Sequence, residues 1–244
     1  MDQIQLPKHV SRIEKDTAFH FSCHPKVSCF TDCCRQLELA LTPYDVLRLK
    51  QETKLESCSF LERYVIQEQE VEESFPRMYL TMVDDGQASC VFVAETGCTV
   101  YPGRPGACRT YPMGRAAIRQ DDNSIEEFFV LLKESHCNGF QEKEEQTAVS
   151  YSKEQGLEDY NAINDKVAML LQHDKFRQGM QLSQVQTEYF VLALYDLDTF
   201  RNRLDQGTLP HRDHYLSQKE LYKDDEQLLL FGIDWLHGVL FKES

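Results

Sequence analysis

The chain has 244 residues, and its 26 Lys and Arg against 40 Asp and Glu give it a formal net charge of −14. This acidic balance argues against binding to nucleic acid, which requires cations that neutralise phosphates, and against an anionic membrane surface. The first residues lack the apolar segment of a secretory signal, and no run of about 18 apolar residues occurs, so we expect a cytoplasmic protein without a membrane span.

Residues 1–22 form a polar lead-in to the most distinctive stretch of the chain, which runs from Cys23 to Cys34. Four cysteines occur there with the spacing C-x5-C-x3-C-C, and Pro25 with its Ser, Thr and Asp neighbours predicts irregular backbone. Disulfides are uncommon in a reducing compartment, so this density of cysteine favours metal ligation. The remaining cysteines are Cys58, Cys90, Cys98, Cys108 and Cys137.

The next elements are predicted to be short helices and strands. A helix should start at Thr42, which can cap it, with Pro43 at the first helical position and Asp45 at the positive end of the helix dipole. A second helix is expected over 59–67. Alternating apolar residues separated by turn residues then predict strands over 78–83, 90–94 and 98–101, and a hairpin of 115–120 with 125–132.

Cysteine is absent after about residue 150, and apolar residues recur there with helical periodicity. We expect helices near 152–172, 183–205 and 217–241. In the second of these, one buried stripe should contain Val185, Tyr189, Leu192 and Leu197. The sequence therefore predicts an α+β fold, with a cysteine-cluster metal-binding domain at 1–145 and a helical C-terminal region at 146–244 that can pack into the same domain.

Thiolates are suitable ligands for zinc and for the irons of iron–sulfur clusters because sulfur is soft. Cys33 and Cys34 are adjacent, and adjacent side chains diverge, so they fit two sites or two corners of a cluster better than one small ion. Eight cysteines would suffice for two four-thiolate sites. The alternative is that some cysteines are small buried apolar residues, as free cysteines often are.

A second unusual feature is the stretch between Glu95 and Asp121, which has four arginines and no acidic residue. A four-thiolate zinc site or a four-thiolate cubane cluster carries negative charge, and nearby guanidinium groups would stabilise it. We expect this role for Arg104 and Arg109, which flank Cys108. The alternative is that these arginines pair with surface carboxylates.

Two cysteine motifs give the chain a resemblance to a known family. The segments FSC, CFTDCC, CVFVAETGC and CTVYPGRPGACRTYP resemble the cysteine-cluster (CxxxCxxCC) family, whose members are described as zinc- or iron-chelating. That family also has a C-x-x-Y-x-x-R-P-x-x-C-R-x-Y-P signature. The signature is matched at Cys98, Tyr101, Arg104, Pro105, Cys108, Arg109, Tyr111 and Pro112, whereas the first motif has spacings of five and three here instead of three and two.

The resemblance implies a metal cofactor, either zinc or an iron–sulfur cluster of the [4Fe-4S] type. It implies flanking roles for Tyr101, Arg104, Arg109 and Tyr111. It leaves out Cys58, which falls on a predicted helix and is expected to be a core thiol. The implied metal ligands are Cys23, Cys29, Cys33, Cys34, Cys90, Cys98, Cys108 and Cys137.

Three functions are consistent with this sequence. The first is a metal-binding protein with a structural or electron-transfer site. The second is a metal-dependent protein N-methyltransferase or its accessory protein, because a flagellin lysine methylase is similar to this family in its cysteine pattern; binding of S-adenosylmethionine would distinguish it. The third is an interaction module that docks a protein partner through its C-terminal helices.

Overall fold

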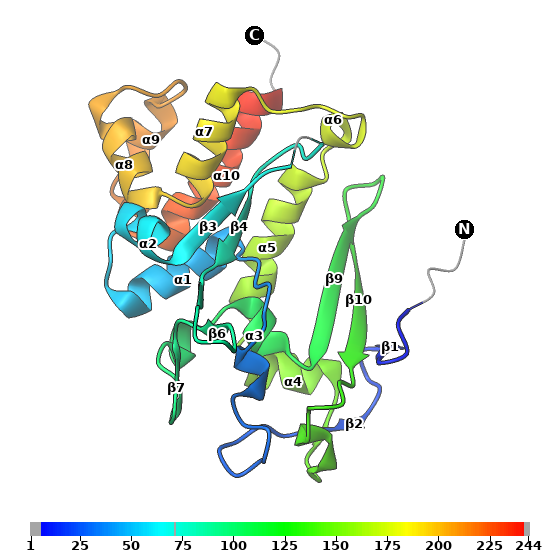
Figure 1. Cartoon of the computed structure of the whole chain (residues 1–244). Helices are drawn as coiled ribbons and strands as arrows, with labels where there is room; N and C mark the ends of the chain where they lie inside the picture. The colour runs from blue at the N-terminus through cyan, green and yellow to red at the C-terminus, as the bar shows by residue number, and fades with distance from the viewer. Residues whose placement is uncertain (1–5, 71, 242–244) are drawn as a thin grey trace. The chain divides into compact units, whose positions relative to one another are not determined.

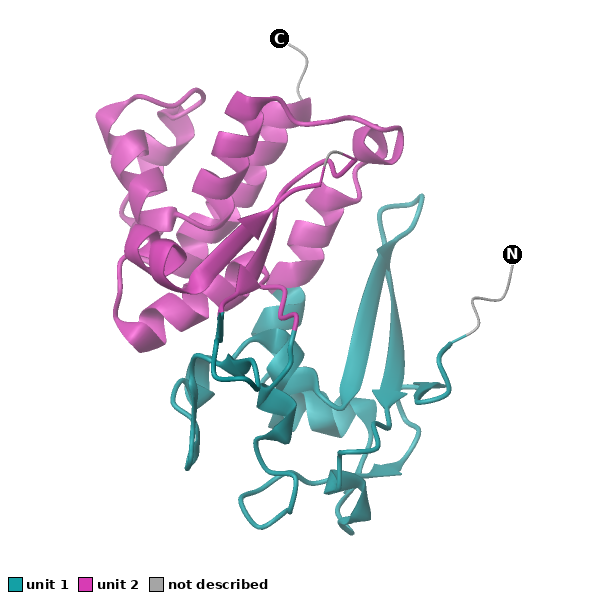
Figure 2. Ribbon diagram, viewed as in Figure 1, with its two compact units in different colours: residues 1–37, 82–162 teal, residues 38–81, 163–244 magenta. Residues whose placement is uncertain are grey.

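The computed structural model describes residues 6–70 and 72–241. Its helices and short antiparallel strand pairs confirm the α+β class (Figure 1). The chain divides into two compact units, and each takes two segments of the sequence (Figure 2). Unit 1 comprises Met1–Leu37 and Met82–Ala162, and unit 2 comprises Glu38–Thr81 and Ile163–Ser244. The predicted domain boundary near residue 146 stays a prediction, because it concerns how the chain folds.

The largest sheet of unit 1 is antiparallel and has the order β1-β10-β9. Its strands are β1 (Val10–Ile13), β9 (Met113–Arg119) and β10 (Ile125–Leu132). The pairing of Ile125 with Arg119 confirms the predicted hairpin. Strand β1 lies in the segment expected to be a polar lead-in, and it was missed because its pairing with β10, rather than a local apolar pattern, makes it extended.

Three two-residue strand pairs complete the β-structure of unit 1. They are β5 (Met82–Val83) with β6 (Ser89–Cys90), β7 (Val93–Ala94) with β8 (Gly97–Cys98), and β2 (Phe19–His20) with β11 (Glu145–Gln146). The strand predicted over 90–94 is thus divided by a turn between β6 and β7. Such short pairs bury little apolar surface, so other contacts must hold the cysteine-bearing segments.

Short helices connect these strands: η1 (Asp32–Cys34), η2 (Tyr101–Gly103), α3 (Gly106–Thr110), η3 (Gly139–Gln141) and α4 (Ala148–Glu154). The helix predicted over 152–172 is two helices, α4 and α5 (Glu158–Leu171). They separate at Gly156, whose φ of 62° is typical of a glycine that ends a helix. The boundary between the two units falls within α5. The Tyr151 ring of α4 lies edge-on to Phe19 and Phe21, with centroids 6.0 and 5.9 Å apart.

Unit 2 begins with the predicted helix α1 (Pro43–Thr53). Its capping box is present: Asp45 N donates to Thr42 Oγ1 at 3.2 Å, and Thr42 N donates to Asp45 Oδ2 at 2.8 Å. Helix α2 (Ser57–Tyr64) follows and ends earlier than predicted. The next residues form β3 (Val65–Glu68), which pairs with β4 (Arg77–Leu80), because β-branched Val65 and Ile66 favour a strand once a partner is present.

The remaining helices of unit 2 are α6 (Asp174–Arg177), α7 (Gln184–Leu194), α8 (Leu197–Gln206), α9 (Asp213–Gln218), η4 (Leu221–Lys223) and α10 (Asp225–Phe241). The helix predicted over 183–205 breaks because Asp196 caps a new helix and accepts a hydrogen bond from Thr199 N at 3.4 Å. The predicted buried stripe is wrong at Val185, whose side chain is 53% exposed. Phe190 and Leu194 of α7 are buried instead.

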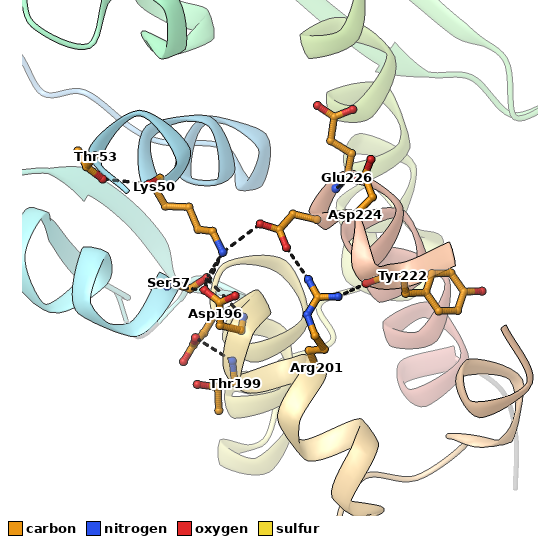
Figure 3. A network of polar contacts seen from close by, with 11 residues as sticks. Lys50, Thr53, Ser57, Asp196, Thr199, Arg201, Tyr222, Asp224 and Glu226 are labelled. Carbon is orange, nitrogen blue, oxygen red and sulfur yellow. Dashed lines mark hydrogen bonds and ion pairs between the residues drawn. The ribbon is translucent and has the colours of Figure 1, made fainter. Parts of the chain in front are cut away.

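A buried ion-pair network connects four helices of unit 2 (Figure 3). The Lys50 ammonium of α1 lies 2.6 Å from Asp198 Oδ2 of α8 and 3.0 Å from Asp225 Oδ2 of α10. Ser57, at the start of α2, donates to the same Asp198 oxygen through its backbone N at 2.7 Å and its hydroxyl at 2.9 Å. Arg201 pairs with Asp225 at 2.5 Å.

Candidate metal centre

All eight cysteines that the family resemblance implies as ligands lie in unit 1, and Cys58 lies in unit 2. No disulfide joins any of the nine, all of which are among the described residues. The expectation that Cys58 is a core thiol is wrong, because its side chain is exposed on the first turn of α2 and its Sγ lies 3.7 Å from Glu62 Oε1. Ser57 and Phe60 are the buried residues of that turn.

The loop from Cys23 to Cys34 is a series of tight turns, as the sequence predicts. Val27 N donates to His24 O at 3.0 Å, Phe30 N to Val27 O at 2.9 Å, and Asp32 N to Cys29 O at 3.0 Å. The last turn is η1, which contains Cys33 and Cys34 and follows Thr31, a residue with a φ of 70°. Each turn folds the backbone back on itself, so cysteines that are several residues apart are kept close.

The segment that carries Cys137 is bonded to this loop. Asn138 N donates to Cys29 Sγ at 3.1 Å, and Asn138 Nδ2 donates to Ser28 Oγ at 2.9 Å. Ser22 N, just before Cys23, donates to Gly139 O at 3.2 Å. An N–H group directed at sulfur stabilises the thiolate form, which is the form that binds metal.

Four cysteines of this region affect one another's thiol pKa values. Burial, followed by the neighbouring thiols of Cys33, Cys29 and Cys137, raises the pKa of Cys23 to about 11. A hydrogen bond to Cys34 and burial raise the pKa of Cys33. Burial raises the pKa of Cys137, and Cys29 and Cys33 add to that effect.

The backbone after Cys34 is bonded to the backbone before Cys90. Arg35 and Ser89 form an isolated antiparallel bridge, and Gln36 N donates to Ala88 O at 3.0 Å. Cys34 precedes Arg35 and Cys90 follows Ser89, so an antiparallel bridge brings these two cysteines to the same end. Gln36 and Ala88 have φ values of 53° and 46°, and this backbone strain is offset by the contacts that join the two segments.

Cys98 is joined to Cys90 through the β7–β8 hairpin. Val93 pairs with Cys98, and Thr99 donates to Phe92 O through its backbone N at 2.9 Å. Burial raises the pKa of Cys90, and the nearby Cys98 adds to that effect. Burial also raises the pKa of Cys98, while backbone hydrogen bonding and the Arg104 guanidinium partly oppose it.

The Arg104 guanidinium is a buried cation among these thiols. Its side chain donates to Tyr101 O at 2.9 Å and to Gln155 Oε1 at 2.6 Å, and it lies 3.8 Å from the centre of the Tyr101 ring. The residue is 8% exposed, and burial lowers its pKa, with Arg109 adding to that effect. Arg104 lies within electrostatic range of Cys23, Cys98 and Cys108.

Arg109 has a different role in the structure. Its guanidinium donates to three backbone carbonyls: that of Arg104 at 3.1 Å, that of Gln155 at 2.7 Å and that of Pro102. It also lies 4.8 Å from the centre of the Tyr160 ring. Arg109 therefore fixes the loop around Cys108 to the end of α4, a role that the sequence did not indicate.

Tyr111 lies beside Cys137. Its hydroxyl donates to Glu134 Oε2 at 2.8 Å, and burial, that carboxylate and the Cys137 thiol all raise its pKa. Tyr101 is 56% exposed, and its ring contacts Arg104. Of the four flanking residues that the resemblance implies, Arg104 lowers the pKa values of the Cys23 and Cys98 thiols through its charge, and Tyr111 lowers that of Cys137 through a hydrogen bond.

The donor set fits zinc or iron in its chemistry, because thiolates are soft ligands. As the side chains stand, no three or more His, Cys, Asp or Glu residues of the described part of the chain are spaced to hold a metal ion. The thiols whose pKa values are raised are protonated at neutral pH, so metal binding would release protons from them. The cysteines therefore share one unit without being spaced as the ligands of one metal ion.

Comparison with known families agrees with this chemistry. Residues 22–165 match the CxxCxxCC family, described as a putative zinc- or iron-chelating domain. The chain belongs to this family. No curated protein and no solved structure gave a significant match. Among the residues that the structure describes, no helix is both long enough and apolar enough to cross a membrane.

Proposed function

We propose that this CxxCxxCC protein is a thiolate metalloprotein that holds zinc or iron, the latter as an iron–sulfur cluster, through the cysteines of unit 1. The observation that carries the proposal is the distribution of the cysteines: eight lie in one compact unit, where backbone hydrogen bonds join their segments, and the ninth is exposed in the other unit. The alternative, that these cysteines are only small apolar core residues, does not explain why the buried Arg104 guanidinium lies within electrostatic range of several of them.

Charge compensation supports the same proposal. A metal bound by four thiolates is anionic, and a desolvated anion needs a nearby cation or N–H donors. The Arg104 guanidinium and the Asn138 N–H supply these, and they come from segments far apart in the sequence. The chain's own residues would therefore bind the metal and stabilise the thiolate form.

The test is anaerobic purification of the full chain, followed by metal analysis and a visible absorption spectrum. Brown protein with iron and acid-labile sulfide would identify a cluster, and colourless protein with zinc would identify a zinc centre. The matched control is Cys58→Ser, which should contain as much metal as the wild type. Wild-type protein that contains neither zinc nor iron would refute the proposal.

A further inference from the structure

The chain contains a single Asn-Gly pair, Asn138–Gly139. In such a pair the asparagine side chain is open to deamidation, because glycine has no Cβ that would hinder its backbone nitrogen. That nitrogen can attack the Cγ atom of the asparagine, and the side-chain amide leaves as ammonia. The pair is therefore a candidate modification site, and its chemistry needs no metal.

Packing explains why glycine occupies position 139. Gly139 is buried in η3, and a Cβ atom added there would lie 2.5 Å from Phe21 Cε2 and 2.8 Å from Ser22 O. The Gly139 carbonyl also accepts a hydrogen bond from Ser22 N at 3.2 Å. A larger residue, which would slow deamidation, does not fit without displacing the Phe21–Ser22 segment.

Hydrogen bonds explain why asparagine occupies position 138. Its Nδ2 donates to Ser28 Oγ at 2.9 Å, and its Oδ1 accepts from Gln141 Nε2 at 3.0 Å. Its backbone N donates to Cys29 Sγ at 3.1 Å. The two residues that form the reactive pair are thus each used to join this segment to the loop that contains Ser28 and Cys29.

The backbone conformation of the folded segment opposes the reaction. Asn138 has a φ of −90° and a ψ of −3°. At this ψ the Gly139 nitrogen eclipses the Asn138 nitrogen, whereas closure of the five-membered ring requires it to eclipse the Asn138 Cβ atom instead. The side chain is also held by Ser28 and Gln141. Ring closure therefore requires local opening of the segment.

We propose that Asn138 is a deamidation site that its bonds to Ser28 and Cys29 keep closed, and that it reacts when segment 137–141 opens. A bond forms between Gly139 N and Asn138 Cγ, and the bond between Cγ and Nδ2 breaks. The Gly139 amide proton leaves with the side-chain amide as ammonia. Water then opens the succinimide ring to aspartate or to isoaspartate, so no oxidant or cofactor is consumed.

The isoaspartate product would keep the segment open. In isoaspartate the main chain runs through Cγ, which adds a carbon atom between the N–H of residue 138 and the carbonyl of Gly139. These two groups bond to Cys29 Sγ and to Ser22 N in the folded chain. Because the added atom changes their spacing, the product cannot form both bonds as they are now, and opening becomes irreversible.

The rate of deamidation in the wild-type full chain tests the proposal. Reduced protein is incubated at neutral pH in native buffer and in concentrated urea. Mass spectrometry of the peptide that contains Asn138 measures deamidation, and electron-based fragmentation distinguishes isoaspartate. Asn138 should react at least about tenfold more slowly in native buffer, since only the open fraction reacts. Asn123, in the exposed turn between β9 and β10, is the internal reference and should differ less between the two conditions.

A substitution beside the site tests the contacts that close it. Ser28→Ala removes the acceptor of Asn138 Nδ2, so Asn138 should react severalfold faster than in the wild type in native buffer and at an equal rate in urea. The matched control is Ser11→Ala, on the exposed side of β1 in the same unit, which should match the wild type in both conditions.

Three results would overturn the proposal. Absence of Asn138 deamidation in urea would show that the residue is not a modification site. Equal rates in native buffer and in urea would show that the fold does not keep it closed. An unchanged native rate in Ser28→Ala would show that the Ser28 bond does not hold it. The first two results come from the wild type and do not depend on how a variant folds.

Discussion

Arg109 shows how a residue beside a candidate ligand can act on the backbone. Its guanidinium donates to the carbonyls of Pro102, Arg104 and Gln155, so one side chain joins η2, the segment before α3 and the end of α4. Arginine suits this position because its planar guanidinium offers several donors in a fixed geometry, and lysine does not. The residue therefore stabilises the loop that presents Cys108.

We expect Arg109→Gln to lower the free energy of unfolding of the metal-loaded chain by about 2 kcal/mol, because hydrogen bonds from a charged donor to the partly buried carbonyls of Arg104 and Gln155 are lost. Urea titration followed by circular dichroism measures this change. The matched control is Arg119→Gln, since Arg119 in the same unit bonds to the nearby Asn123 side chain. Equal losses in the two variants would show that the Arg109 contacts do not matter to the fold.

The sequence predicted the chemistry of the candidate site better than its geometry. Cysteine density and the arginine signature are visible in the sequence and led to eight thiols that the structure places in one unit. The Asn138 N–H bond to Cys29 joins residues 109 positions apart, and no local pattern indicates it. Cys58 was assigned to the core because it falls on a predicted helix, but Ser57 and Phe60 are the residues that α2 buries, and Cys58 is exposed.

At the scale of elements, α7 and α10 approach each other closely at a glycine. A Cβ atom added at Gly232 of α10 would lie 2.4 Å from Ala193 O of α7. Glycine is normally unfavourable within a helix, by about 1 kcal/mol relative to alanine. Close backbone approach explains why it is present here.

We therefore expect Gly232→Ala to destabilise unit 2 by about 1–3 kcal/mol, since the new methyl group forces the two helices apart. The sign of the stability change is informative, because a Gly→Ala substitution at an open helical position would raise stability. Thermal unfolding followed by circular dichroism measures it. A higher melting temperature for the variant would contradict the close approach of these helices.

The Lys50 network predicts a pH dependence for unit 2. Burial raises the pKa of Asp198, but hydrogen bonds from Lys50 and Ser57 outweigh burial and lower it below its usual 3.8. A carboxylate with a lowered pKa stabilises the folded state above the pKa of the unfolded state, and this contribution is lost as the pH falls through the folded-state value. The loss should therefore occur below about pH 4.

We expect Asp198→Asn to cost about 2–3 kcal/mol at neutral pH, since Lys50 keeps Asp225 as a partner and the loss stays below that of a fully unpaired buried charge. The difference between wild type and variant should shrink as the pH falls below about 4. Urea unfolding at several pH values tests this, with Asp234→Asn on the exposed side of α10 as the control. A difference that does not change with pH would exclude an ionic role for Asp198.

The sequence predicted where the longer helical segments lie, but not the short helices α3, α6 and α9, nor where each helix ends. The start of α1 was predictable because Thr42, Pro43 and Asp45 form a local capping signal. The break between α7 and α8 was not, because an Asp within an apolar pattern can be either a cap or an exposed residue. The end of α2 depends on pairing of β3 with β4, which is not a local property.

At the scale of the whole molecule, the domain boundary predicted from the cysteine distribution differs from the boundaries of the two compact units. The sequence places a boundary near residue 146, where cysteines end and helices begin. The compact units assign α4 to the cysteine-rich part and α1 and α2 to the helical part. The two divisions thus disagree over 38–81 and over 146–162. The second of these stretches contains α4, which holds Gln155, the partner of Arg104 and Arg109, at its end.

Removal of metal should show which division governs stability. Binding free energy contributes to folding where no site exists in the unfolded chain, so a strong chelator under reducing conditions should loosen the segments that carry ligands. Hydrogen exchange read by peptide should show loss of protection over Cys23–Cys34 and Cys90–Cys108, with protection retained near Val185–Leu197. Helix α4 should lose protection together with Cys23–Cys34 and Cys90–Cys108, because Arg104 and Arg109 donate hydrogen bonds to Gln155 at its end. Retained protection in α4 would support the boundary near 146. Simultaneous loss of protection in all segments would show that the chain is one cooperative domain. If no segment loses protection, the cysteines hold no metal on which the fold depends.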